Sequence, residues 1–108
     1  MPTKSIPKDV REQVKAIVDQ FNLDVFTDSD RSYIPRFWGK YLFLDREDFG
    51  SVGPICRLEY TGDMKKWQFA IYKFSSERYD LEEWFFLGEE FADGTVEGAM
   101  KAGVKAYD

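Results

Sequence analysis

Residues 55–74 read ICRLEYTGDMKKWQFAIYKF, and their alternation of apolar and polar side chains predicts a β-hairpin with strands at 55–60 and 67–74. One register places apolar residues opposite one another on a single face: Tyr60 with Trp67, Leu58 with Phe69, and Cys56 with Ile71. A shift by one residue would bring Arg57 and Glu59 among the aromatic rings. We therefore predict the unshifted register, in which one face is apolar and the other is mixed.

The chain on the two sides of this hairpin supplies further strands. Residues 36–45, RFWGKYLFLD, are rich in aromatic and aliphatic side chains and predict a strand covered on both faces. Residues 45–54, DREDFGSVGP, contain two glycines and a proline, and we expect them to form a connection. Two shorter apolar stretches, Leu23–Phe26 and Trp84–Leu87, are interpreted as short strands, although the first can instead be the tail of a preceding helix packing back.

Helices are predicted before and after these strands. Residues 8–21 form an amphipathic pattern of period 3.6, with Pro7 suited to the first turn and Asn22 as the expected end. The apolar stripe contains Val10, Val14, Ile17, Val18 and Phe21. Further along, Asp80 with Glu83 three residues later predicts the start of one helical turn.

The last helix is predicted to begin after Thr95, whose hydroxyl is a good N-cap. Its stripe consists of Val96, Met100, Val104 and Tyr107, and a set of small residues accompanies it: Gly98, Ala99, Ala102, Gly103 and Ala106. Each glycine lowers helix stability by about 0.5–1 kcal/mol relative to alanine, so this helix depends on tertiary contacts. The small residues let it approach the sheet closely.

The order of elements is therefore a helix, three or four antiparallel strands and a second helix. The simplest arrangement covers the apolar face of the sheet with the N- and C-terminal helices, so we predict a two-layer α+β sandwich. A length of 108 residues is typical of one domain, and we expect residues 1–108 to form a single domain.

The composition excludes several classes of protein. The chain has no histidine and one cysteine, which removes histidine-dependent catalysis and the usual zinc sites. The longest apolar run, Trp84–Leu87, is far shorter than the ~20 residues of a membrane span, and residues 1–7 lack the apolar stretch of a signal peptide. Cys56 alone cannot form an internal disulfide, so nothing indicates an oxidising compartment. From these features together we expect a soluble, cytoplasmic protein.

The sequence contains no convincing motif for a metal or a cofactor. Residues 45–50, DREDFG, are rich in carboxylates, but a calcium loop starting at Asp45 would place Phe49 and Cys56 at ligand positions, so a solvated turn is the better interpretation. Gly50–Gly53 matches a GxxG nucleic-acid clamp without its helical context. Cys56 lies on the apolar side of a strand, where a thiol packs as a small hydrophobic group. We expect no cofactor and no metal.

The mixed face of the sheet is where we expect binding. Its candidate residues are Trp38, Lys40, Arg57, Glu59, Gln68, Tyr72 and Phe74. Aromatic rings interleaved with cations can stack bases and hold phosphates, and the same residue types are enriched at protein interfaces. A third interpretation is that residues 75–94 simply cover these rings. The sequence leaves the three open.

Three stretches carry a resemblance to other proteins: RFWGKYLFLDR at 36–46, RLEYTGDMKKWQFAIYKFSSERYD at 57–80 and DGTVEGAMKAGVKAY at 93–107, together about half of the chain. They resemble a small family of uncharacterised prokaryotic proteins with no assigned activity. The resemblance implies a similar α+β layout. It supplies no catalytic residue, ligand or partner.

The function that these features favour is a non-catalytic interaction module that binds a protein partner or a second copy through the mixed face. The alternative is single-stranded nucleic acid, with Trp38, Tyr72 and Phe74 for stacking and Arg57, Lys40 and Lys73 for phosphates. A pI near 4.8 and the eight carboxylates in residues 79–108 oppose this alternative. No pair of carboxylates stands out as a catalytic site, so enzyme activity is disfavoured.

Overall fold

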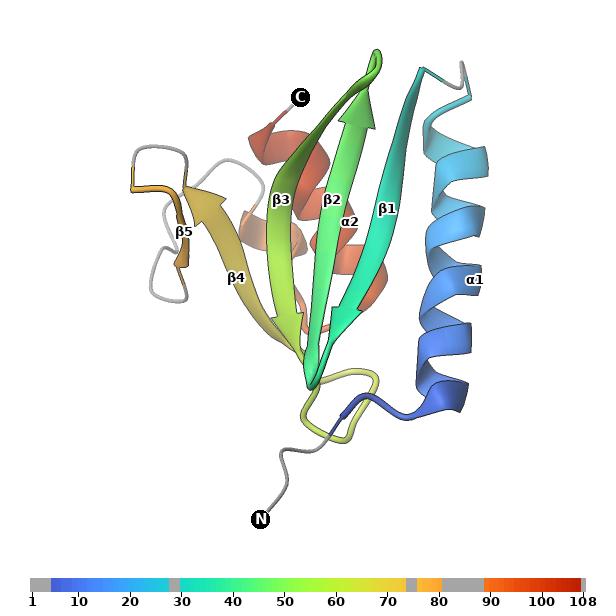
Figure 1. The fold of residues 1–108 in the computed structure, drawn as a ribbon, viewed down its shortest axis with the longest axis vertical. Helices are drawn as coiled ribbons and strands as arrows, with labels where there is room; N and C mark the ends of the chain where they lie inside the picture. Colours follow the sequence, from blue (N-terminus) through green and yellow to red (C-terminus); the bar gives the residue numbers. More distant parts are fainter. Residues whose placement is uncertain (1–4, 28–29, 74–75, 81–88, 108) are drawn as a thin grey trace.

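Five antiparallel strands pair in chain order, β1-β2-β3-β4-β5, and two helices pack with them (Figure 1). The computed structural model describes residues 5–27, 30–73, 76–80 and 89–107. The elements are α1 (Lys8–Val25), β1 (Arg31–Trp38), β2 (Tyr41–Asp48), β3 (Ser51–Glu59), β4 (Gln68–Lys73), β5 (Arg78–Asp80), a 3-10 helix η1 (Glu89–Phe91) and α2 (Val96–Ala106). The predicted α+β class is confirmed, with five strands in place of three or four.

The hairpin formed by β3 and β4 has the predicted register. Leu58 pairs with Phe69, and Arg57 pairs with Ala70 on the opposite face. Beyond the paired residues, the rings of Tyr60 and Trp67 lie 5.0 Å apart between centroids. The alternation of side chains was therefore sufficient to predict how these two strands align.

The segment predicted as one strand at 36–45 contains the end of β1 and most of β2, joined by a tight turn. Trp38 pairs with Tyr41, so Gly39 and Lys40 form a two-residue connection between β1 and β2. Gly39 has φ of 57°, a left-handed conformation that glycine adopts without steric cost at the first position of such turns. The prediction was wrong because apolar residues on both sides of Gly39 masked the break.

The predicted connection at 45–54 is a second hairpin. Asp48 pairs with Ser51, and the turn residues Phe49 and Gly50 both have positive φ, 52° and 91°. The register shifts where Leu44 pairs with Cys56 and Asp45 pairs with Pro54, so Ile55 is the extra residue of a β-bulge. A bulge tolerates a proline inside a strand, which is why residues that resemble a loop lie in β3.

Helix α1 has the predicted apolar stripe but ends later than expected. Val10, Val14, Val18 and Phe21 are buried, and the helix continues to Val25. The predicted strand at Leu23–Phe26 is therefore wrong, Asn22 does not end the helix, and Pro7 is its N-cap residue rather than its first residue.

Asn22 instead joins α1 to the sheet. Its Nδ2 donates to the carbonyl oxygen of Tyr33 at 3.1 Å, and its Oδ1 accepts from the Tyr33 N–H at 2.8 Å. These backbone groups belong to β1, the strand at one edge of the sheet. Figure 1 shows α1 running beside β1. The helix therefore covers an edge that would otherwise be open to another strand.

Helix α2 packs closely on the sheet, as its small residues predicted. The Thr95 Oγ1 accepts from the Gly98 N–H at 2.9 Å, which confirms the predicted cap. A Cβ atom at Gly103 would clash with the Tyr33 hydroxyl and with a methyl group of Ile55. No larger residue fits there without displacing one of them.

A buried arginine holds the end of α2 in place. Arg46 is only 4% exposed, its Nε donates to Asp48 Oδ2 at 3.0 Å, and its guanidinium donates to the carbonyl oxygen of Tyr107. A cation is favourable there because carbonyl groups at a helix C-terminus lack intrahelical donors. The sequence analysis placed Arg46 in a connection and missed this contact.

Strand β5 bears on one further prediction, the helical turn that starts at Asp80. Asp80 is the last residue of this strand and pairs with Ile71, which is compatible with the extended backbone of a capping residue. The rest of that turn and the predicted strand at Trp84–Leu87 lie outside the described residues.

Candidate functional site

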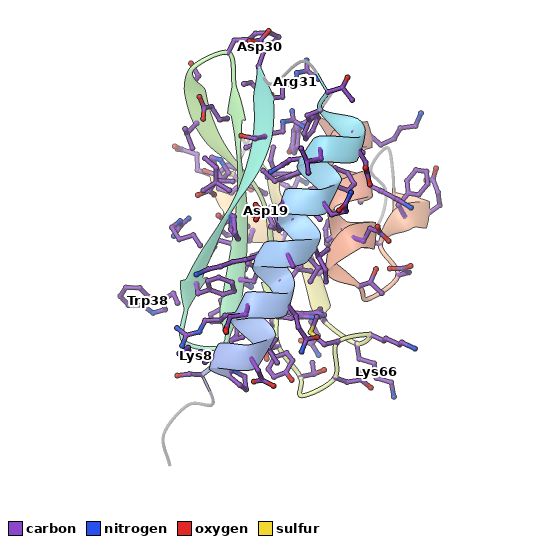
Figure 2. The ribbon with its side chains drawn as sticks, turned by 90° about the vertical axis from the view of Figure 1, so that its right-hand side faces the viewer. Lys8, Asp19, Asp30, Arg31, Trp38 and Lys66 are labelled. Atoms are coloured by element: carbon purple, nitrogen blue, oxygen red, sulfur yellow. The ribbon has the colours of Figure 1, made fainter. Side chains whose placement is uncertain are left out.

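The sheet has a helix-covered face and an opposite face, which we call the outer face. Its described side chains follow from strand alternation and pairing: Ile34, Arg36, Trp38, Tyr41, Phe43, Asp45, Glu47, Val52, Arg57, Glu59, Gln68, Ala70, Tyr72 and Tyr79. Trp38 is 76% exposed, and Figure 2 shows it pointing away from both helices. The outer face is thus the mixed face that the sequence predicted.

Two rows of side chains cross the outer face from strand to strand. The first contains Trp38, Tyr41, Glu59 and Gln68, and the second contains Arg36, Phe43, Arg57 and Ala70. Lys40 lies in the turn beside the first row. The next pair along β4 and β5 is Tyr72 with Tyr79. Neighbours in such rows are close enough for side-chain contact.

Aromatic rings form a chain of contacts across these rows. The centroids of Tyr41 and Phe43 are 6.1 Å apart, those of Phe43 and Tyr79 5.4 Å, and those of Tyr79 and Tyr72 5.1 Å. Each of the four residues is half-buried. They form a continuous aromatic floor on β2, β4 and β5.

Cations lie on this floor. The Arg36 guanidinium is 4.5 Å from the Phe43 centroid. The Arg57 guanidinium is 4.6 Å from the Tyr41 centroid and 5.5 Å from that of Tyr79. Such distances are within the range of cation–π attraction, which fixes flexible arginine side chains against the rings.

Carboxylates neutralise two of the three cations on the outer face. Arg36 Nε is 3.1 Å from Asp45 Oδ2, and Lys40 Nζ is 3.3 Å from Glu59 Oε2. The hydrogen bond to Asp45 raises the pKa of Arg36. Burial raises the pKa of Tyr79, and the neighbouring Asp45 charge adds to the increase. Both groups therefore keep their ordinary charge at neutral pH.

The third cation, Arg57, has no carboxylate partner in the described parts of the chain. Its contacts are with the two tyrosine rings. Glu47, on the same face, has no cationic partner within those ranges either. Among the described residues, the outer face therefore presents one unpaired charge of each sign.

Six of the seven predicted site residues lie on the outer face or at its edge. Trp38, Glu59 and Gln68 share a row, Lys40 adjoins it, and Arg57 and Tyr72 lie on the rows beyond. The seventh, Phe74, lies outside the described residues.

Sequence reasoning missed three aromatic residues of this face and one of its cations: Tyr41, Phe43, Tyr79 and Arg36. Most of them could have been predicted from the sequence if Gly39 had been recognised as a turn residue. Once a turn is placed there, strand alternation assigns Arg36, Tyr41 and Phe43 to the face of Trp38.

The described residues include no exposed thiol and no cluster suited to a metal ion. Cys56 is buried, and burial raises the pKa of its thiol, so the nucleophilic thiolate does not form at neutral pH. Among the described residues, no group of three or more acidic or cysteine side chains is placed to hold a metal ion. None of the helices there is both long and apolar enough to cross a membrane.

Comparison of the chain with protein-family models, with curated proteins and with solved structures finds no match. The family resemblance of residues 36–46, 57–80 and 93–107 therefore stays a prediction. Function has to be inferred from the outer face itself.

Proposed function

We propose that this protein is a non-catalytic interaction module of the cytoplasm that binds a protein partner through the outer face. The supporting observation is Trp38, a large apolar side chain that is 76% exposed beside an ordered layer of arginine and tyrosine. Tryptophan, tyrosine and arginine dominate the binding energy of protein interfaces.

The edge of the sheet supports the same proposal. Helix α1 covers β1, and Asn22 occupies the outward backbone groups of Tyr33. A partner therefore cannot add a strand at this position, whereas the outer face is open at Trp38. At the β1 edge, this arrangement favours face-to-face contact over strand addition; β5 forms the opposite edge of the sheet.

Single-stranded nucleic acid is the competing ligand, because rings and cations lie together on the outer face. Two of the cations, Arg36 and Lys40, are already paired with carboxylates. The protein also carries a net charge of −5, which opposes a phosphate backbone. These charges favour a protein partner over nucleic acid.

A matched pair of variants tests the proposal. Trp38→Ala removes the exposed ring of the outer face, and Leu23→Ala removes a side chain of similar exposure, 71%, from the end of α1. We expect an affinity column of wild type or Leu23→Ala to capture a protein that Trp38→Ala does not. The captured protein counts only when its purified form gives the same difference in titrations.

Equal capture by all three proteins would contradict the proposal.

A titration of the protein with a mixed-sequence oligonucleotide at low salt, followed by tryptophan fluorescence, tests the competing ligand. Quenching that is lost at high salt and in Trp38→Ala would replace the proposed partner with nucleic acid, because electrostatic binding is tightest at low salt.

A further inference from the structure

The outer face carries equal numbers of positive and negative side chains, so two copies of this face can complement each other in charge. Three cations, Arg36, Lys40 and Arg57, lie with three carboxylates, Asp45, Glu47 and Glu59. Two internal ion pairs leave only Arg57 and Glu47 without an oppositely charged partner among the described residues. These six charges sum to zero, so they provide no net charge to attract a strongly acidic or strongly basic partner. A second outer face supplies the complement of each unpaired group.

The positions of these two residues suit a two-fold interface. Arg57 lies opposite Phe43 across β2 and β3, and Glu47 lies four residues further along β2 on the same face. Four residues of a strand span roughly 13 Å. A two-fold axis that lies between two facing sheets, midway between these positions, exchanges them. Each Arg57 then meets the Glu47 of the other copy, and both ion pairs form together.

The setting of Arg57 suits this role. Its guanidinium is held at 4.6 Å from the Tyr41 centroid and 5.5 Å from the Tyr79 centroid, so little side-chain freedom remains to be lost on binding. A guanidinium stacked on rings keeps its N–H edge available, and that planar edge matches the two oxygens of a carboxylate.

The size of the outer face is also sufficient for self-association. The five strands have 8, 8, 9, 6 and 3 residues, which at roughly 3.3 Å per residue and 4.8 Å between strands give a footprint of roughly 540 Å². Side-chain relief raises the accessible area toward the ~800 Å² that each partner buries in a standard interface. Exposed apolar side chains of this face, Ile34, Trp38 and Val52, supply the area that ion pairs alone do not.

We propose, on the basis of the proposed function, that the partner is a second copy of this chain. The two outer faces pack against each other about a two-fold axis, and Arg57 of each copy pairs with Glu47 of the other.

Light scattering after size-exclusion chromatography at micromolar concentration tests the pairing by charge reversal. Wild type is expected to have the mass of a dimer. Arg57→Glu and Glu47→Arg place like charges opposite each other twice, so each variant alone is expected to be a monomer. Mixed together, the two variants place opposite charges at both contacts and are expected to form a heterodimer. A chain that carries both substitutions is expected to dimerise again.

Control reversals lie away from the outer face. Lys66→Glu, in the loop before β4, and Glu12→Arg, on α1, are expected to leave the dimer unchanged. Circular dichroism and thermal unfolding verify that each variant is folded. If Arg57→Glu does not fold, Glu47→Arg mixed with Arg57→Gln provides the second test, in which heterodimer must exceed the homodimer of Glu47→Arg.

Two outcomes would overturn the inference. One is a monomeric wild type, and the other is a pair of single variants that stay dimeric or fail to associate when mixed. A monomeric wild type that still binds a purified partner through Trp38 overturns only the second copy as partner. Loss of both behaviours would remove the proposed function as well.

Discussion

Arg46 and Arg57 lie on opposite faces of the sheet and differ in what surrounds them. Arg46, on the helix-covered face, is 4% exposed and bonded to Asp48 and to the carbonyl oxygen of Tyr107. Arg57, on the outer face, rests on tyrosine rings without a carboxylate partner among the described residues. Arg46 is therefore fixed by hydrogen bonds inside the fold, whereas Arg57 is held against the rings of the outer face. Burial and partners, rather than residue type, separate the two arginines.

The helix-covered face is expected to be the more sensitive to substitution, and Trp67→Ala provides the largest test. Trp67 is 3% exposed and packs against Tyr60. Truncation of a buried tryptophan costs about 3–5 kcal/mol, a large fraction of the ~5–15 kcal/mol stability of a small domain. Urea denaturation is expected to show a strongly lowered midpoint or no folded baseline. A shift below about 1 kcal/mol would contradict the core position of Trp67.

Removal of the buried arginine is expected to have the next largest effect. Arg46→Ala removes the hydrogen bonds to Asp48 Oδ2 and to the Tyr107 carbonyl oxygen, and hydrogen bonds that involve a charged group contribute about 1.5–3 kcal/mol. The same denaturation measurement gives the loss in the free energy of unfolding. Hydrogen exchange is expected to accelerate first at the C-terminal turn of α2. Uniform acceleration over all elements would contradict the capping role of Arg46.

Alkaline pH is expected to destabilise the helix-covered face through Cys56 and Tyr33. Burial raises the pKa of both groups in the folded protein. The unfolded chain therefore loses these protons first, and stability falls as pH rises above the ordinary cysteine pKa of 9.0 and tyrosine pKa of 10.0. One proton corresponds to about 1.4 kcal/mol per pH unit. Denaturation midpoints from pH 8 to about pH 11 measure the slope, and Tyr33→Phe is expected to reduce it above pH 10.

The smallest effect on folding is expected for Arg57→Ala. The substitution removes two cation–π contacts, each worth about 0.5–1 kcal/mol at an exposed site, and leaves no buried carboxylate unpaired. Chemical denaturation is expected to place this variant within about 1–2 kcal/mol of wild type, while association through the outer face weakens. Unfolding as severe as that of Trp67→Ala would invert the roles of the two faces.

Much of the fold followed from local patterns. The β3–β4 register, the stripe of α1 and the Thr95 cap all depend on residues close in sequence, and all three are confirmed. The candidate site was predicted in outline for the same reason, since alternation along a strand assigns side chains to a face. The strand count was wrong because apolar residues on both sides of Gly39 and Lys40 masked the turn there.

What remained was decided by contacts between distant residues. Helix α1 extends past Asn22, and the side-chain amide of Asn22 bonds to the backbone of Tyr33, eleven residues away. Arg46 is buried because α2 ends above it, 61 residues later. The sequence alone determined which side chains face the same way. Only the tertiary structure decided which charges are neutralised and which, like Arg57 and Glu47, have no oppositely charged partner among the described residues, because pairing depends on distances between residues far apart in the sequence.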